Sequence, residues 1–274
     1  MEKHDQPVDE KDEDLIKQGI LKADTESIVS SAPSRSEQVE EDAKVPIDDT
    51  TFSPTRTFYI LRHNLFSTEI NLIDISSEIA VNSPYSGGEI SNELRDAARE
   101  LSKDEMRTSN PAYRLKRPHW WNSTCKMSGI AAEELELASW KHPSMSFGKA
   151  SITFPQNSTH SSHNFIMAPV KWYRRTNEWV QDSVTYSWRC NSKYKANRMT
   201  LYKKIGGKNI VVARYAQRWG SWVTGGVLLV DAVEVDEVVA GLTACVMLRR
   251  MQQRAAERMK SAGVGGGGGG GGGD

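Results

Sequence analysis

The chain has 274 residues, of which 38% are apolar and eight are tryptophan, so it can bury one large core or two small ones. Its 35 basic and 35 acidic residues balance overall but not locally, because residues 1–50 hold 15 acidic and 6 basic residues, a net charge of −9, against +9 for the remainder. Its three cysteines have no paired spacing and its N-terminus has no apolar segment, which argues against a disulfide framework, a zinc knuckle or a signal peptide and predicts an intracellular protein, cytoplasmic or peripheral to a membrane.

Both ends of the chain are predicted to be disordered. Residues 1–52 are acidic, their apolar residues are scattered and Phe52 is the first aromatic residue, so they cannot bury enough surface to offset the entropy of ordering. Residues 255–274 include nine consecutive glycines, 265–273, which have maximal backbone freedom and no side chains to pack. Residues 53–254 remain as one folded domain.

The first part of this domain is rich in short β-like runs. Segments of strand length with β-branched or aromatic content are separated by polar turn residues, and they predict strands at 57–62, 69–75, 113–116, 135–140, 147–154 and 165–172. One exception interrupts them: residues 91–106 are rich in helix formers, with apolar residues three and four apart, and predict a surface helix.

A β-hairpin is the clearest local signal. Two β-like runs, 198–205 and 208–215, flank Gly206 and Gly207, which can adopt the positive φ angles of a tight turn. Further strands are predicted at 185–189 before the hairpin and at 226–230 after it.

The last element determines the fold class. Residues 233–250 predict a helix in which Val238–Leu248 carries no charge and is apolar on every face, so it must be buried on all sides. A buried strand is the alternative for such a valine-rich run. The run is too short to span a membrane, and acidic residues precede it. A chain of strands ending in one buried helix predicts a closed antiparallel β-barrel that encloses a hydrophobic C-terminal helix.

The order of three segments resembles the tubby C-terminal-like superfamily, and within it the LURP-one-related and fungal tubby-like proteins. The segments are LELASWKHPSMSFGKASITFP, TYSWRCNSKYKANRMTLYKKIGGKNIVVARY, and GGVLLV followed by DEVVAGLTACVMLRR. The resemblance implies a barrel around a hydrophobic helix and, for some members, phosphoinositide binding through basic residues on the barrel surface. The chain departs from tubby proteins by continuing past the helix, and it lacks the cysteine cluster and calcium-binding segment of the related scramblases.

Catalytic motifs are not found, which predicts a protein that is not an enzyme and needs no cofactor. The sequence has no nucleophile elbow, P-loop or zinc-protease motif. His160 and His163, with Cys190 as a third ligand, are a conceivable metal site, but a serine-rich loop normally holds solvated histidines. Cys125 and Cys190 have no adjacent base that would activate a nucleophile. We expect no metal site and no catalytic residue.

The remaining signal is positive charge. Residues 171–218 contain 12 Lys or Arg and 2 acidic residues, which predicts attraction to anions, although any barrel exposes alternate charged residues to solvent. The expected ligand is an anionic membrane lipid, a phosphoinositide, and nucleic acid is disfavoured. A structural or protein-interaction scaffold, with the acidic N-terminal segment recruiting partner proteins, is the alternative function. The residues predicted to bind the anion are Lys193, Lys195, Arg198, Lys203 and Lys204.

Overall fold

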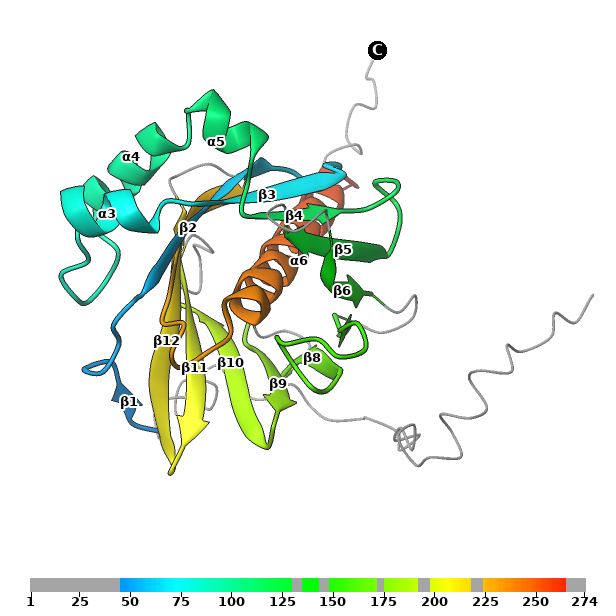
Figure 1. Ribbon diagram of the computed structural model, residues 1–274. Coiled ribbons are helices and arrows are strands. Elements are labelled where there is room, and N and C mark those ends of the chain that lie inside the picture. Colours follow the sequence, from blue (N-terminus) through cyan, green and yellow to red (C-terminus); the bar gives the residue numbers. More distant parts are fainter. Residues whose placement is uncertain are drawn as a thin grey trace, which may run out of the picture. The chain divides into compact units, whose positions relative to one another are not determined.

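The computed structural model describes residues 45–129, 135–142, 148–171, 175–191, 198–217 and 224–264 (Figure 1). The predicted disordered segments 1–52 and 255–274 therefore lie partly outside the described residues. The elements in chain order are β1 (Ile47–Asp48), β2 (Arg56–His63), β3 (Glu69–Asp74), α3 (Ser76–Asn82), α4 (Asn92–Leu101), α5 (Glu105–Ser109), β4 (Tyr113–Lys116), β5 (Thr124–Gly129), β6 (Glu136–Lys141), β7 (Ala150–Thr153), β8 (Phe165–Pro169), β9 (Asn177–Gln181), β10 (Val184–Cys190), β11 (Arg198–Ile205), β12 (Lys208–Gln217), β13 (Thr224–Val230) and α6 (Glu237–Val264).

The strands form a closed antiparallel barrel, as the sequence predicts. Each strand from β2 to β13 pairs with the next one along the chain, and β13 also pairs with β2, so the sheet returns to its start. The short strand β1 adds in parallel to β12 at Asn209 and Ile210, whereas β13 pairs with β12 only from Ala213 onwards. Strand β1 therefore covers a part of the β12 edge that β13 does not reach, where unpaired backbone groups would otherwise be exposed.

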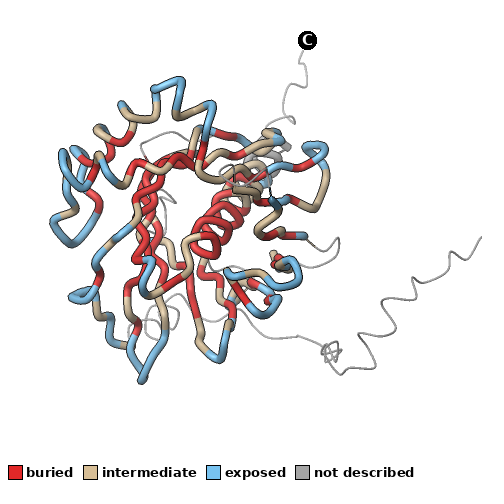
Figure 2. Tube along the Cα trace, viewed as in Figure 1, coloured by how far each residue is buried: buried red, intermediate tan, exposed pale blue. Residues whose placement is uncertain are grey.

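Helix α6 passes through the interior of the barrel (Figure 2). Residues 238–248 are all buried and pack against inward-facing side chains of the barrel strands. The indole Nε1 of Trp188 donates a hydrogen bond of 2.9 Å to the hydroxyl of Thr243, so the one hydroxyl in this part of the helix has a partner. The charge-free run in the sequence is therefore the core of the barrel.

A second core lies outside the barrel wall. Helices α3 and α4 cover the outer face of β2, β12 and β13, and Ile79 and Leu94 pack there against outward-facing strand residues such as Val227 and Leu229. Strand β13 is therefore buried on both faces, which explains why its sequence is apolar without alternation.

Three predicted boundaries were wrong. The single helix expected at 91–106 is two helices, because the Asp104 side chain accepts the Met106 amide proton and caps a new helix, α5. The terminal helix begins at Glu237 instead of 233, since Asp236 caps it by accepting the amide protons of Val238 and Val239. It continues to Val264 instead of 250, so residues 255–264 of the predicted tail are helical.

The predicted disordered segment 1–52 also extended too far along the chain. Residues 45–52 belong to the described fold: the amide of Asn209 donates to the carbonyl of Pro46, and Phe52 is buried against Tyr85 with ring centroids 5.5 Å apart. The pairing of β1 with β12 and the contact of Phe52 with Tyr85 attach this segment to the fold.

The barrel has two distinct ends. Because neighbouring strands are antiparallel, all even-numbered strands from β2 to β12 run towards one end, and α6 runs towards the same end. Arg249 of α6 donates to the carbonyl of Leu65, which lies just after β2. We call this the exit end, and we call the other end, where α6 begins, the entrance end.

Candidate functional site

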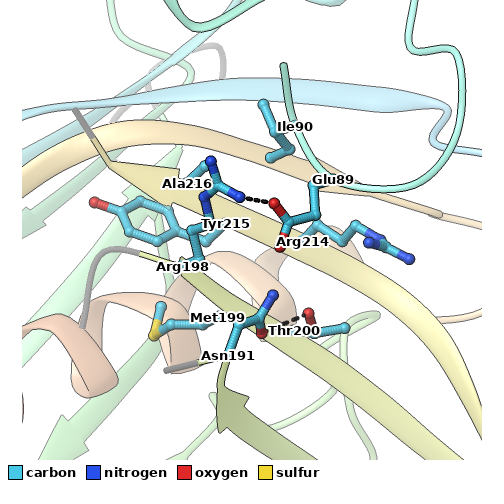
Figure 3. A pocket seen from close by; sticks show the side chains of 9 residues that line it. All are labelled: Glu89, Ile90, Asn191, Arg198, Met199, Thr200, Arg214, Tyr215 and Ala216. Atoms are coloured by element: carbon cyan, nitrogen blue, oxygen red, sulfur yellow. Dashed lines mark hydrogen bonds and ion pairs between the residues drawn. The ribbon is translucent and has the colours of Figure 1, made fainter. Parts of the chain in front are cut away.

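The three predicted anion-binding residues that the structure describes do not form one site. Arg198 forms an ion pair with Glu89 in a cleft of about 10 Å³, room for no more than a water molecule (Figure 3). Lys203 is paired with Glu234 at 3.2 Å, and Lys204 is exposed. Lys193 and Lys195 lie outside the described residues. Two of the three described residues therefore already have a carboxylate partner.

Strand β11 also separates these residues in space. Arg198 begins β11 at the exit end, whereas Lys203 and Lys204 lie near its other end. At about 3.3 Å per residue, the five residues from Arg198 to Lys203 span roughly 17 Å along the strand. The excess of basic residues in 171–218 therefore brings together residues that lie at opposite ends of the barrel.

The entrance end is rich in carboxylates that have partners. Arg56 donates to Glu237 at 2.6 Å and to Asp74 at 3.1 Å, and the hydroxyl of Tyr113 donates to Glu237. Burial alone would raise the pKa of Glu237, but the hydrogen bonds from Arg56 and Tyr113 lower it. This network anchors the first turn of α6 to the barrel wall.

The residues considered for catalysis or metal binding lie in separate surroundings. His160 Nδ1 lies 3.0 Å from Asp236, the residue that caps α6. Burial raises the pKa of Cys125 to about 12 and that of Cys190 to about 11, so both are thiols at neutral pH. In the described part of the chain, no three histidine, cysteine or acidic side chains are grouped closely enough to hold a metal ion.

The exit end holds two arginines that tie two connections together. The guanidinium of Arg117 donates to the carbonyls of Leu65, Ser67 and Trp120, and that of Arg249 donates to Leu65 at 2.9 Å and to Trp120 at 3.4 Å. These bonds join the connection 64–68 to the connection 117–123. Arginine suits this role because its planar fork donates in several directions at once.

A third arginine lies deeper at the same end. Arg250 is 6% exposed and donates to the side-chain oxygen of Asn177 and, at 3.2 Å, to the carbonyl of Met167. Its Nε has no hydrogen-bond partner within the described part of the chain. Burial lowers the pKa of Arg249 and of Arg250 to about 10, but both remain charged at neutral pH.

The described part of the chain places no carboxylate counter-charge against these arginines. Among the described residues, no carboxylate lies within ion-pair distance of Arg117, Arg249 or Arg250; they donate to neutral oxygens only. Two histidines lie nearby, His63, which is buried, and His142, which is half-buried. The pKa of each is lowered to about 4, mainly by burial of the ring and further by the charges of the arginines. A buried positive charge without a counter-charge attracts anions.

Further positive charge lies on the outside of the exit end. Arg62, Lys116 and Lys141 are exposed and stand at or next to the last residues of β2, β4 and β6. Lys116 and Arg117 also line a hollow of about 270 Å³, together with Pro118, Lys126, Met127, Ser128 and Glu136. Glu136 in this hollow is paired with Lys126 at 2.8 Å.

The connections at the exit end are also basic in sequence. Six connections join strands there, residues 64–68, 117–123, 142–149, 170–176, 191–197 and 218–223, and none of them contains an aspartate or a glutamate. They contain eight basic residues and five of the eight tryptophans. Two of the connections, 64–68 and 117–123, are described in full.

Sequence reasoning missed this end because its residues are scattered along the chain. The signal, connections that lack acidic residues and are rich in tryptophan and arginine, becomes visible only when strand directions show which connections share an end. Lys193 and Lys195 belong by sequence to one of these connections. Arg117 and Arg249, which carry the described geometry, were not among the predicted residues.

Comparisons of the chain with protein-family models, curated proteins and solved structures give no match. Within the described residues, no helix is both long enough and apolar enough to cross a bilayer.

Proposed function

We propose that the chain is a non-enzymatic binding module, a peripheral adaptor that attaches to membranes through anionic lipid. The observation that carries the proposal is the positive charge of the exit end, where Arg117, Arg249 and Arg250 have no carboxylate partner among the described residues. We also propose that the chain belongs to the tubby C-terminal-like superfamily, since its closed barrel and enclosed helix agree with the fold that this resemblance implies.

The exit end supports this role better than the hairpin does. A basic residue already paired with a carboxylate gains little from an anionic surface, because a new contact must first break the old one. Arg198 and Lys203 are in that position, whereas Lys116 and Lys141 are exposed and the arginines behind them have no carboxylate partner among the described residues. An exposed basic residue near an anionic bilayer contributes about 1 kcal/mol of binding free energy.

The test is co-flotation of the full chain with lipid vesicles. We expect binding to vesicles that contain phosphoinositide or phosphatidylserine, weaker binding at higher salt because the attraction is screened, and no binding to neutral phosphatidylcholine vesicles. A difference between the two anionic lipids would show whether the phosphorylated headgroup itself is recognised.

A matched pair of double variants locates the binding surface. Lys116→Gln with Lys141→Gln removes two exposed charges from the exit end, and Lys204→Gln with Lys208→Gln removes two exposed charges from the hairpin. We expect the first pair to weaken vesicle binding about tenfold or more and the second to leave it nearly unchanged. The reverse result would assign binding to the hairpin. Failure of the unaltered chain to bind any anionic vesicle would favour the scaffold function.

A further inference from the structure

An exposed group of aromatic side chains stands at the exit end. Phe66 is 62% exposed, Trp120 48% and Trp121 66%, although residues of this kind are usually buried. Phe66 and Trp120 have ring centroids 5.3 Å apart, Trp120 and Trp121 5.5 Å apart, and His119 stacks on Trp121 at 4.7 Å. We call Phe66, Trp120 and Trp121 the aromatic cluster.

The cluster is held in place from below. Its residues belong to the connections 64–68 and 117–123, which Arg117 and Arg249 join through hydrogen bonds to the carbonyls of Leu65 and Trp120. Within the first connection, Asn64 also accepts the amide protons of Phe66 and Ser67 at 2.9 and 3.0 Å. These bonds hold the backbone of both connections at the surface, and the barrel interior behind them is already filled by α6.

Charge complementarity indicates what covers the cluster. The arginines beneath it are not paired with carboxylates in the described part of the chain, and exposed Arg62 and Lys116 stand beside it. Tryptophan and phenylalanine prefer the boundary between headgroups and acyl chains, and basic residues next to them contact anionic headgroups. A protein partner would need an acidic rim around an apolar centre, whereas an anionic bilayer presents both over any area.

We infer that the aromatic cluster enters the interfacial zone of an anionic bilayer, so that the barrel stands on the membrane with its exit end. This inference rests on the proposed function and adds the surface, the orientation and a second source of binding free energy. The lysines and arginines supply a salt-sensitive attraction, and burial of the rings supplies a part that salt does not screen.

The experiment compares two double variants that each replace two exposed apolar side chains. Phe66→Ser with Trp121→Ser removes two rings of the cluster, and Ile166→Ser with Val180→Ser removes two side chains, 53% and 58% exposed, from the barrel wall on β8 and β9. On phosphatidylserine vesicles at moderate salt, we expect the first variant to bind about tenfold or more weakly than the unaltered chain and the second to bind equally.

A fluorescent label reports insertion directly. A nitrobenzoxadiazole label on Phe66→Cys should shift its emission to the blue on anionic vesicles, and the same label on Val180→Cys should not, because only the first enters the bilayer. If the unaltered chain does not bind vesicles, both the proposed function and this surface are overturned. If it binds, but the cluster variant binds equally well and the label at 66 stays in water, the aromatic surface alone is overturned.

Discussion

At the scale of single residues, the described fold keeps two histidines neutral inside a positively charged end. His63 is 4% exposed, its Nδ1 lies 3.0 Å from the carbonyl of Leu61, and Arg117 and Arg249 are near enough to oppose a second positive charge. Burial is the main cause of its low pKa. Protonation of His63 at low pH should therefore destabilise the exit end of the barrel, where the exposed basic residues also lie.

This sensitivity predicts how stability depends on pH. The pKa of His63 is about 4 in the folded protein and about 6.5 in an unfolded chain, so below pH 6.5 the unfolded state binds protons that the folded state rejects. The neutral, buried His63 therefore does not reduce stability above pH 6.5, and the free energy of unfolding falls as the pH is lowered from 6.5 towards 4. From pH 7 to pH 5 we expect His63 to lower the free energy of unfolding by about 2 kcal/mol.

Urea unfolding at a series of pH values measures this effect. His63→Asn should make the loss of stability between pH 7 and 5 shallower, whereas His163→Asn, which changes an exposed histidine, should leave the slope as it is. An unchanged slope in the His63 variant would contradict the assignment.

At the scale of elements, helix α6 connects the two ends of the barrel. Its first turn is fixed by Asp236 and by the pair of Arg56 with Glu237, and its last buried turns bring Arg249 and Arg250 to the exit end. Between them the helix offers almost only apolar contacts. Two buried polar contacts lie within this stretch: Trp188 donates to the hydroxyl of Thr243, and the side-chain amide of Asn177 donates to the sulfur of Met247.

We expect Thr243→Val to lower the free energy of unfolding by about 1–3 kcal/mol, because the indole donor of Trp188 would be buried without a partner. Trp188→Phe removes that donor, so Thr243→Val should cost clearly less in the Trp188→Phe background. Unfolding of the four proteins of this cycle in urea gives the coupling. Equal costs in both backgrounds would show that the bond contributes nothing.

The elements differ in how far the sequence predicts them. The hairpin of β11 and β12 was predicted because Gly206 and Gly207 supply its two positive φ angles, 56° and 76°. Helix α6 was predicted because no exposed helix is apolar on every face. Strands β5 and β9 were missed, since TCKMSG and NEWVQ mix polar and apolar residues and gain their strand conformation from paired neighbours.

The candidate site was less predictable than the fold. Arg117 and Arg249 are 132 positions apart in the sequence and meet only because β4 and α6 finish at the same end of the barrel. Conversely, Arg198 and Lys203 are neighbours in the sequence but belong to opposite ends. A cluster of basic residues in the sequence therefore predicts a basic surface patch only when the strands that carry them are short or when the directions of those strands are known.

At the scale of the whole barrel, charge is distributed along the axis of α6. The connection 231–236 at the entrance end carries Asp231, Glu234 and Asp236, whereas the six connections at the exit end carry no acidic residue. This arrangement complements the dipole of α6. The acidic residues lie at the positive N-terminal end of the helix, and Arg249 and Arg250 lie towards its negative C-terminal end. Such a molecule approaches an anionic surface with one end first.

Hydrogen exchange with and without phosphatidylserine vesicles tests this orientation most directly. We predict slower exchange of the amides in 64–68 and 117–123 when vesicles are present, and unchanged exchange in residues 204–208 at the tip of the hairpin. Slower exchange confined to 204–208, with none at the exit end, would contradict the account and assign membrane binding to the opposite end of the barrel.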